Sequence, residues 1–90
     1  MTVYVIAVYD VSERRVAKCL KTFRRYLVWV QNSVFEGELS EAQIKKLQAD
    51  LGRVLNWDED SVLFYIATTR HYTERRALGR KKGDPSEIIL

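Results

Sequence analysis

Residues 3–9 read VYVIAVY and are apolar or aromatic at every position. Side chains alternate between the two faces of a strand, so a strand built from these residues has no polar face. Strands of this kind lie inside sheets that are covered on both sides. The sequence therefore predicts a central strand whose two faces are both buried.

After this strand, the apolar residues recur with the spacing of a helix. Apolar residues recur at i, i+3, i+4, i+7 and i+11, in the order Val16, Cys19, Leu20, Phe23, Leu27. This period predicts an amphipathic helix over residues 12–25. Its start can be capped by Ser12, or by Asp10 with Glu13 three residues further on. Cys19 lies in the apolar stripe and is expected to be a small buried side chain.

The rest of the chain repeats the pattern. Residues 27–39 return to extended character, with Gln31 and Asn32 as a turn or bulge between two short strands. Ser40 and Gln43 match a capping box and begin a second helix over residues 41–55. A polar turn at 56–60 leads to a strand at 62–67, which is again apolar on both faces.

This order predicts an α+β domain with the ferredoxin-like β-α-β-β-α-β pattern and a C-terminal extension. The domain is expected to occupy residues 1–80 and the tail residues 81–90. A basic stretch at 70–82 and a turn at 83–85 precede the apolar residues 88–90. These last residues are expected to fray, to pair with a partner protomer's sheet, or to dock on another protein.

Both helices of this fold lie on one face of the sheet, so the apolar second face needs another cover. In 90 residues there is room for a single core only. An uncovered apolar sheet would be a liability for a monomer, and a symmetric pair of chains removes it. The strand pattern therefore predicts a homodimer that packs through its sheet faces.

Composition narrows the range of chemistry. With a single histidine, His71, and a single cysteine, the sequence gives no support to a Ser-His-Asp or Cys-His arrangement, and it has no C-x-x-C spacing of a zinc site. No apolar run approaches the roughly 20 residues of a membrane-spanning helix, so no membrane association is expected. The single cysteine cannot form an internal disulfide, which favours a cytoplasmic location.

Asp10 is the candidate metal ligand and catalytic residue. It ends an apolar strand just before a helix, where it can simply cap the helix. Two-fold symmetry would instead bring a second Asp10 to the dimer axis, and two facing carboxylates can share a divalent cation. The residues alone leave both alternatives open.

The candidate nucleic-acid contacts are basic. One cluster lies on the first helix, at Arg14, Arg15, Lys18, Lys21, Arg24 and Arg25, and a second at Arg70, Arg75, Arg76, Arg80, Lys81 and Lys82. Such faces are often only solvated, but two clusters in a dimer would form an extended positive surface that suits binding of a phosphate backbone.

Ser33 has no base beside it in the sequence and is interpreted as a structural hydroxyl.

Several short stretches of this sequence match the motifs of one known family. They are Tyr9-Asp10 after the first strand, Arg15-Val16-Ala17 in the helix, residues 62–67, and above all the stretch Gln31-Asn32-Ser33-Val34-Phe35-Glu36-Gly37. Together they resemble the small CRISPR-associated endonuclease family (CRISPR-associated protein 2), the smaller subunit of the spacer-acquisition machinery. The resemblance extends to about residue 80.

The resemblance implies a homodimer in which Asp10 of each chain binds Mg²⁺ or Mn²⁺. Tyr9, Arg15, Ser33 and Phe35 match positions that support that site in the family. The implied substrates are single-stranded RNA or double-stranded DNA, and the implied partner is the larger CRISPR-associated integrase subunit. Trp29 stands where some relatives carry an arginine, which weakens the expectation of arginine support for the phosphate.

Three functional hypotheses follow. The first is a metal-dependent endonuclease that acts in spacer acquisition and antiviral defence, with Asp10 at its centre. The second is a non-catalytic scaffold that holds DNA on Arg14, Arg15, Lys18, Lys21, Arg25, Arg75 and Arg76 while bridging integrase subunits. The third is a ferredoxin-like regulator that binds a small molecule and shows no salt-dependent affinity for DNA.

Overall fold

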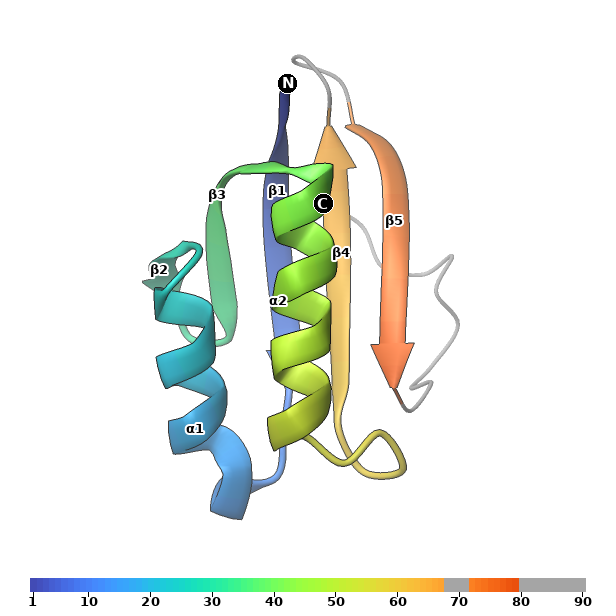
Figure 1. Ribbon diagram of the computed structural model, residues 1–90. Coiled ribbons are helices and arrows are strands. Elements are labelled where there is room, and N and C mark those ends of the chain that lie inside the picture. Colours follow the sequence, from blue (N-terminus) through green and yellow to red (C-terminus); the bar gives the residue numbers. More distant parts are fainter. Residues whose placement is uncertain (68–71, 80–90) are drawn as a thin grey trace.

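The computed structural model describes residues 1–67 and 72–79 of the chain. Five strands form one antiparallel sheet in the order β2-β3-β1-β4-β5, and two helices accompany it (Figure 1). The elements are β1 (Thr2–Asp10), α1 (Glu13–Arg24), β2 (Val28–Gln31), β3 (Val34–Ser40), α2 (Glu41–Val54), β4 (Ser61–Ala67) and β5 (Tyr72–Gly79). The predicted ferredoxin-like order is confirmed, and the two strands that are apolar on both faces, β1 and β4, are neighbours inside the sheet.

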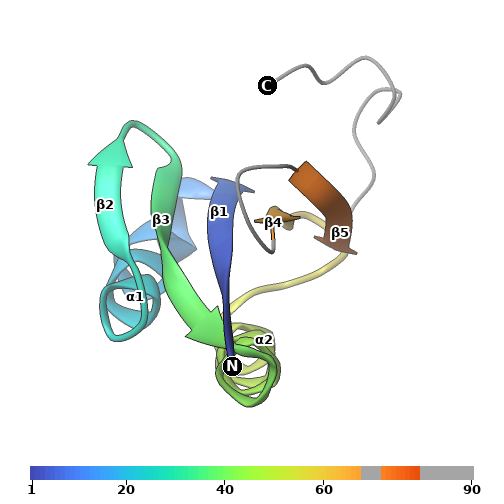
Figure 2. The same cartoon turned by 90° about the horizontal axis from the view of Figure 1, so that it is seen from above.

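Both helices cover the same face of the sheet, as the view from above shows (Figure 2). The alternation in β1 turns Val5, Ala7 and Tyr9 toward the helices, where they are buried. The apolar stripes of the helices meet them with Cys19, Phe23, Ile44, Leu47 and Leu51, all fully buried. Each such side chain contributes about 1.5–3 kcal/mol when it leaves water, apart from the smaller cysteine, so this layer is the core.

We call the face of the sheet that points away from the two helices the open face (Figure 2). It carries Tyr4, Ile6 and Val8 from β1, whose direct partners on β4 are Ala67, Tyr65 and Leu63. On β3 the partners of these three residues are Glu38, Glu36 and Val34. The open face is therefore apolar along β1 and β4, as predicted. On the neighbouring strand β3 it carries the two acidic residues Glu36 and Glu38.

A fifth strand corrects the sequence analysis. Residues 72–79 were expected to be part of a basic stretch, but they pair with β4 along its whole length as β5. Charged residues at 74, 75 and 76 hide the strand pattern, and an edge strand tolerates them because one side of its backbone faces solvent. The turn at 83–85 and the tail at 81–90, with its apolar end at 88–90, lie outside the described residues.

The ends of the helices show how their boundaries arise. At α2 the predicted capping box is present: the backbone N–H of Gln43 donates to Ser40 Oγ at 3.1 Å, and Gln43 Oε1 accepts from the N–H of Ser40 at 2.8 Å. At α1, Ser12 is the N-cap residue, but its side chain makes no capping hydrogen bond. The predicted turn after β2 is confirmed, with Asn32 at φ 43°. Within the described part of the chain, neither helix has the length and hydropathy to cross a membrane.

Candidate functional site

Asp10 is the last residue of β1 and is exposed to solvent. Its direct partner on β4 is Ser61, two positions along from the pair of Val8 and Leu63. Direct partners in an antiparallel sheet project to the same side, and every second residue of a strand shares a face. Asp10 therefore lies on the same face as Tyr4, Ile6 and Val8, at the end of the open apolar surface.

Tyr9 and Ser33 lie beside this position. The backbone N–H of Tyr9 donates to the carbonyl oxygen of Ser33 at 3.0 Å, and the Tyr9 hydroxyl donates to the carbonyl oxygen of Asn32 at 3.2 Å. Burial raises the pKa of Tyr9, so the phenol is neutral. Tyr9 thus ties the turn between β2 and β3 to the end of β1 with its hydroxyl, while its ring belongs to the core.

Phe35 lies farther inside. It is fully buried, and its ring centroid is 4.9 Å from that of Phe23 and 6.2 Å from that of Tyr9. The ring is enclosed in the core and has no exposed face on which a nucleotide base could stack. Trp29, by contrast, is 53% exposed on the edge strand β2, where its indole N–H donates to the carbonyl oxygen of Asn32 at 3.1 Å.

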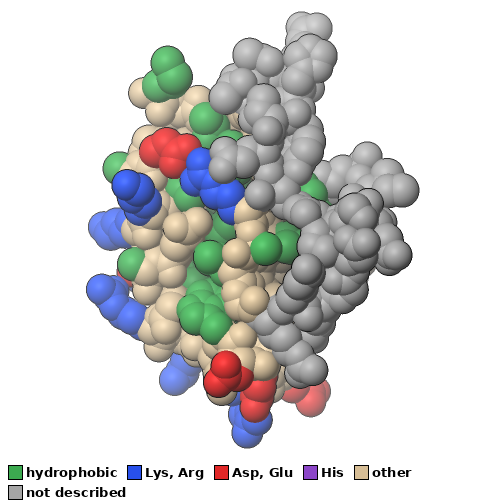
Figure 3. All heavy atoms as spheres, turned by 90° about the vertical axis from the view of Figure 1, so that its right-hand side faces the viewer, with side chains coloured by type: hydrophobic (Ala, Val, Ile, Leu, Met, Phe, Trp, Pro, Cys, Tyr) green, Lys and Arg blue, Asp and Glu red, His purple; other side chains and the backbone are tan. Residues whose placement is uncertain are grey.

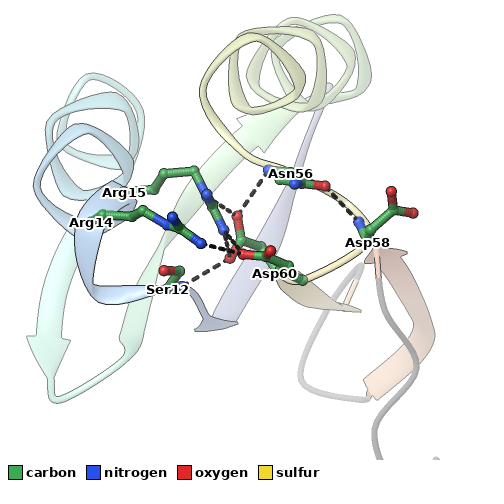
Figure 4. Close-up of polar contacts among 7 residues, drawn as sticks. Ser12, Arg14, Arg15, Asn56, Asp58 and Asp60 are labelled. Atoms are coloured by element: carbon green, nitrogen blue, oxygen red, sulfur yellow. Dashed lines mark hydrogen bonds and ion pairs between the residues drawn. The ribbon is translucent and has the colours of Figure 1, made fainter.

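A buried carboxylate holds the turn that follows Asp10 (Figure 4). Asp60 is fully buried and directly precedes β4. Its Oδ1 accepts from the backbone N–H of Ser12 at 2.8 Å and from Arg15 Nη2 at 3.1 Å. Its Oδ2 accepts from Arg15 Nε at 2.6 Å and from the backbone N–H of Asn56 at 2.9 Å. Each carboxylate oxygen thus receives two donors, which satisfies a charge that would otherwise be costly to bury.

Electrostatics agree with this geometry. The hydrogen bonds from Arg15 lower the pKa of Asp60 to about 2, against the opposing effect of burial, and the N–H groups of Ser12 and Asn56 add to the lowering. Arg15 also holds Glu59, whose Oε1 accepts from Arg15 Nη2 at 2.7 Å and from Arg14 Nη2 at 3.2 Å. The hydrogen bonds from Arg15 and Arg14 keep the pKa of Glu59 below its usual value, and those to Asp60 and then Glu59 raise the pKa of Arg15.

Arg15, a predicted nucleic-acid contact, is already engaged by carboxylates of its own chain. The Arg15 side chain is 18% exposed, and its guanidinium points into the turn that Asp60 and Glu59 form. The Arg14 side chain, one residue earlier, is 72% exposed although it reaches Glu59. The neighbouring arginines therefore differ in what they can offer a ligand.

The other predicted contacts are spread over the molecule. Lys18 and Lys21 are exposed on α1, and Arg25 is 62% exposed with Asp50 3.6 Å away. Arg76 is 29% exposed and donates to both carboxylate oxygens of Glu41, at 3.2 and 2.9 Å. Figure 3 shows the side of the molecule that carries β5, where Lys and Arg side chains lie along the left margin and near the upper centre. Arg75 lies in β5 with its side chain outside the description, and Arg70, Arg80, Lys81 and Lys82 lie outside the described residues.

Sequence reasoning missed Asp60, which it assigned to a polar turn. The available signal was its place directly before an apolar strand, in the tetrapeptide WDED. A carboxylate there shares the buried environment of the strand and needs a cation and N–H donors close by. Among the described residues of this single chain, no three metal-ligating side chains gather at one place.

Together, the sheet order, the pair of helices on one face and the acid at the end of β1 place this chain among the small ferredoxin-like α+β proteins. The particular family follows from comparison. The model of the family described as "CRISPR associated protein Cas2" matches residues 1–75, and the chain belongs to this family. The resemblance seen in the sequence is thereby confirmed.

Relatives match over almost the whole chain. A protein of Dictyoglomus turgidum named "CRISPR-associated endoribonuclease Cas2" is 49% identical and aligns over 96% of this chain and 99% of its own length. A protein of Thermotoga maritima with the same name is 50% identical over the same shares. A solved structure described as "Crystal structure of cas2" is 44% identical, aligns over all of both chains and superposes with a TM-score of 0.73.

Proposed function

We propose that this chain is a CRISPR-associated, metal-dependent endonuclease that cleaves phosphodiester bonds in RNA and acts as a homodimer. The observation that carries the proposal is the position of Asp10, at the end of β1 on the open apolar face. Support for the reaction and for RNA comes from the two relatives described above, both named endoribonucleases. Their naming favours the nuclease over the non-catalytic scaffold.

The homodimer completes the site. The open face presents Ile6, Val8, Val34 and Leu63, which are only half-buried in the single chain. Packing two such faces about a two-fold axis removes apolar surface from water at both, and it repeats every residue near the axis. Since Asp10 lies on the same face, dimerisation gives its carboxylate a symmetric counterpart.

The donor set suits a hard divalent cation. Mg²⁺ and Mn²⁺ prefer oxygen ligands, and Mg²⁺ in nucleotide-processing sites is held by one or two carboxylates together with water and substrate phosphate. Asp10 is exposed and supplies such a carboxylate from each chain. The bound ion would polarise the scissile phosphate and lower the pKa of a water molecule. Asp10 holds the ion, while Tyr9, Ser33 and Phe35 keep the end of β1 in place.

We assign the contacts with the phosphates of the substrate to the exposed Lys and Arg side chains of α1 and its C-terminal end. Arg14, Lys18 and Lys21 are exposed along the helix, and Arg25 is the exposed residue that caps its C-terminal end. Contacts of this kind read phosphates and not bases, so binding should be independent of sequence and sensitive to salt. We assign Arg15 and Arg76 to the fold, since each is held by carboxylates, and keep Arg75 as a predicted contact.

The proposed role in the cell is supported by membership of the CRISPR-associated family. We propose that the dimer serves spacer acquisition and antiviral defence in the cytoplasm and that the larger integrase subunit is its partner. The thiol of Cys19, buried with its pKa raised to about 12, accords with a chain that needs no disulfide. For the tail at 81–90, the three predicted alternatives stay open: a frayed end, a strand on the partner protomer's sheet, or a docking segment for the integrase subunit.

The test compares Asp10→Asn with Asp58→Asn. Asp58 is an exposed aspartate in the turn before β4, so the same chemical change there serves as the matched control. We expect Asp10→Asn to lose Mn²⁺-stimulated cleavage of single-stranded RNA while remaining a dimer by light scattering, and Asp58→Asn to cleave like the unmodified chain. Cleavage that survives in purified Asp10→Asn would refute the proposal.

A further inference from the structure

The turn between β1 and α1 is short and is held from two sides. Two residues, Val11 and Ser12, separate the end of β1 from the first residue of α1. On one side Asp10 pairs with Ser61 in the sheet. On the other side the N–H of Ser12 donates to the carboxylate of Asp60, the residue before Ser61. The chain is thus attached at Asp10 itself and again two residues later at Ser12, to the adjacent residues Ser61 and Asp60.

Asp60 gathers three further segments at this point. Its carboxylate receives the guanidinium of Arg15 from the first turn of α1 and the backbone N–H of Asn56 from the segment after α2. Its carbonyl oxygen lies against Gly79 at the end of β5, so closely that a Cβ there would collide with it. In Figure 1 the end of β1, the start of α1 and the turn before β4 meet at the bottom of the molecule.

We infer that Asp60 and Arg15 are positioning residues for Asp10: the buried pair fixes the β1–α1 turn and thereby the direction of the Asp10 carboxylate at the proposed metal site. This inference rests on the proposed function. It also gives Arg15 a role different from a direct phosphate contact, because Nε and Nη2 of its guanidinium already donate to Asp60 and Glu59. Outer groups of this kind orient metal ligands, and their loss typically lowers metal affinity 10- to 100-fold.

The structure supplies a matched control at the other end of α1. Asp50 on α2 accepts from the Tyr26 hydroxyl and from Arg53 Nη1 at 3.0 Å, and Arg25 lies 3.6 Å from it. Asp50 is also largely buried, with 11% of its side chain exposed. A helix of 12 residues is about 18 Å long, so this cluster is remote from Asp10. Asp50→Asn therefore loosens a helix contact without touching the β1–α1 turn.

The experiment measures Mn²⁺ binding by electron paramagnetic resonance in the purified dimer, for Asp60→Asn, Arg15→Lys, Asp50→Asn and the unmodified chain. Arg15→Lys keeps the charge but not the two-pronged contact, and it guards against a failure of Asp60→Asn to fold. We expect the Mn²⁺ dissociation constant to rise about 10-fold in the first two variants and to stay unchanged in Asp50→Asn. RNA binding without metal should be unaffected by Arg15→Lys.

The outcomes separate the inference from the proposed function. Unchanged Mn²⁺ affinity in folded Asp60→Asn and Arg15→Lys, with weaker RNA binding in Arg15→Lys, would overturn the inference and restore Arg15 as a phosphate contact. Absence of Mn²⁺ binding in the unmodified chain would refute the proposed metal site. In that case hydrogen exchange decides the inference: faster exchange in Asp60→Asn confined to residues 10–15 supports it, and exchange spread evenly over the chain overturns it.

Discussion

Acid should remove a defined part of the stability of this protein through Asp60. The folded chain holds the pKa of this carboxyl at about 2, against a usual value of 3.8. The Asp60 carboxylate therefore takes up its proton at a lower pH in the folded chain than in the unfolded chain. The contribution of Asp60 is fully present above the unfolded pKa and is lost as pH falls from about 4 to about 2.

The magnitude follows from the shift. One pKa unit corresponds to about 1.4 kcal/mol, so the difference amounts to about 2 kcal/mol of unfolding free energy. Asp60 is fully buried, which shields the contacts that cause the shift from solvent screening. Asp60→Asn has no proton to take up in this range. The stability advantage of the unmodified chain over this variant should therefore shrink by about 2 kcal/mol between pH 5 and pH 2.

Urea unfolding followed by circular dichroism measures this difference at a fixed protein concentration, because a dimer's stability depends on concentration. Asp58→Asn, in the same turn, is the control and should run parallel to the unmodified chain. Asp50, whose pKa is also lowered, lies on α2 away from this turn, so its titration is the same in all three proteins and cancels. A difference between the unmodified chain and Asp60→Asn that stays constant over this pH range would refute the reasoning.

Three further predictions concern packing and charge. Gly79→Ala should lower stability by about 1–3 kcal/mol, because Gly79 has φ 87° and an added Cβ would lie 2.6 Å from the Trp57 ring; urea unfolding measures it. Phe35→Ala should cost about 3–5 kcal/mol while Trp29→Ala costs under about 1, and similar costs would contradict the burial of the first ring. Lys21→Gln should reduce the slope of RNA affinity against salt by about one unit in a filter-binding titration, and an unchanged slope would exclude Lys21 as a phosphate contact.

The architecture could be predicted because its signals are local. The apolar run at residues 3–9 predicts an internal strand, and the capping box at Ser40 and Gln43 marks the start of α2 within one residue. Periodicity needs no knowledge of distant segments, since each residue's face follows from its neighbours in the sequence. The order of the strands then follows from the few topologies that short connections allow.

The parts that sequence reasoning missed depend on distant contacts. β5 has charged residues through its middle, and only the edge of β4 makes it a strand. Asp60 looks like a turn residue until Arg15, 45 positions away, closes over it. The basic residues illustrate the same point: composition predicts charge, but only the fold shows that Arg76 is held by Glu41 whereas Lys18 is exposed.

The stoichiometry of Mn²⁺ binding tests the central claim most directly, because that claim makes Asp10 of two chains parts of one site. Titration of the purified dimer, followed by electron paramagnetic resonance, should saturate at one ion per two chains, and Asp10→Asn should abolish this binding. One ion per chain, or an ion that still binds to Asp10→Asn, would contradict a shared site at the dimer axis.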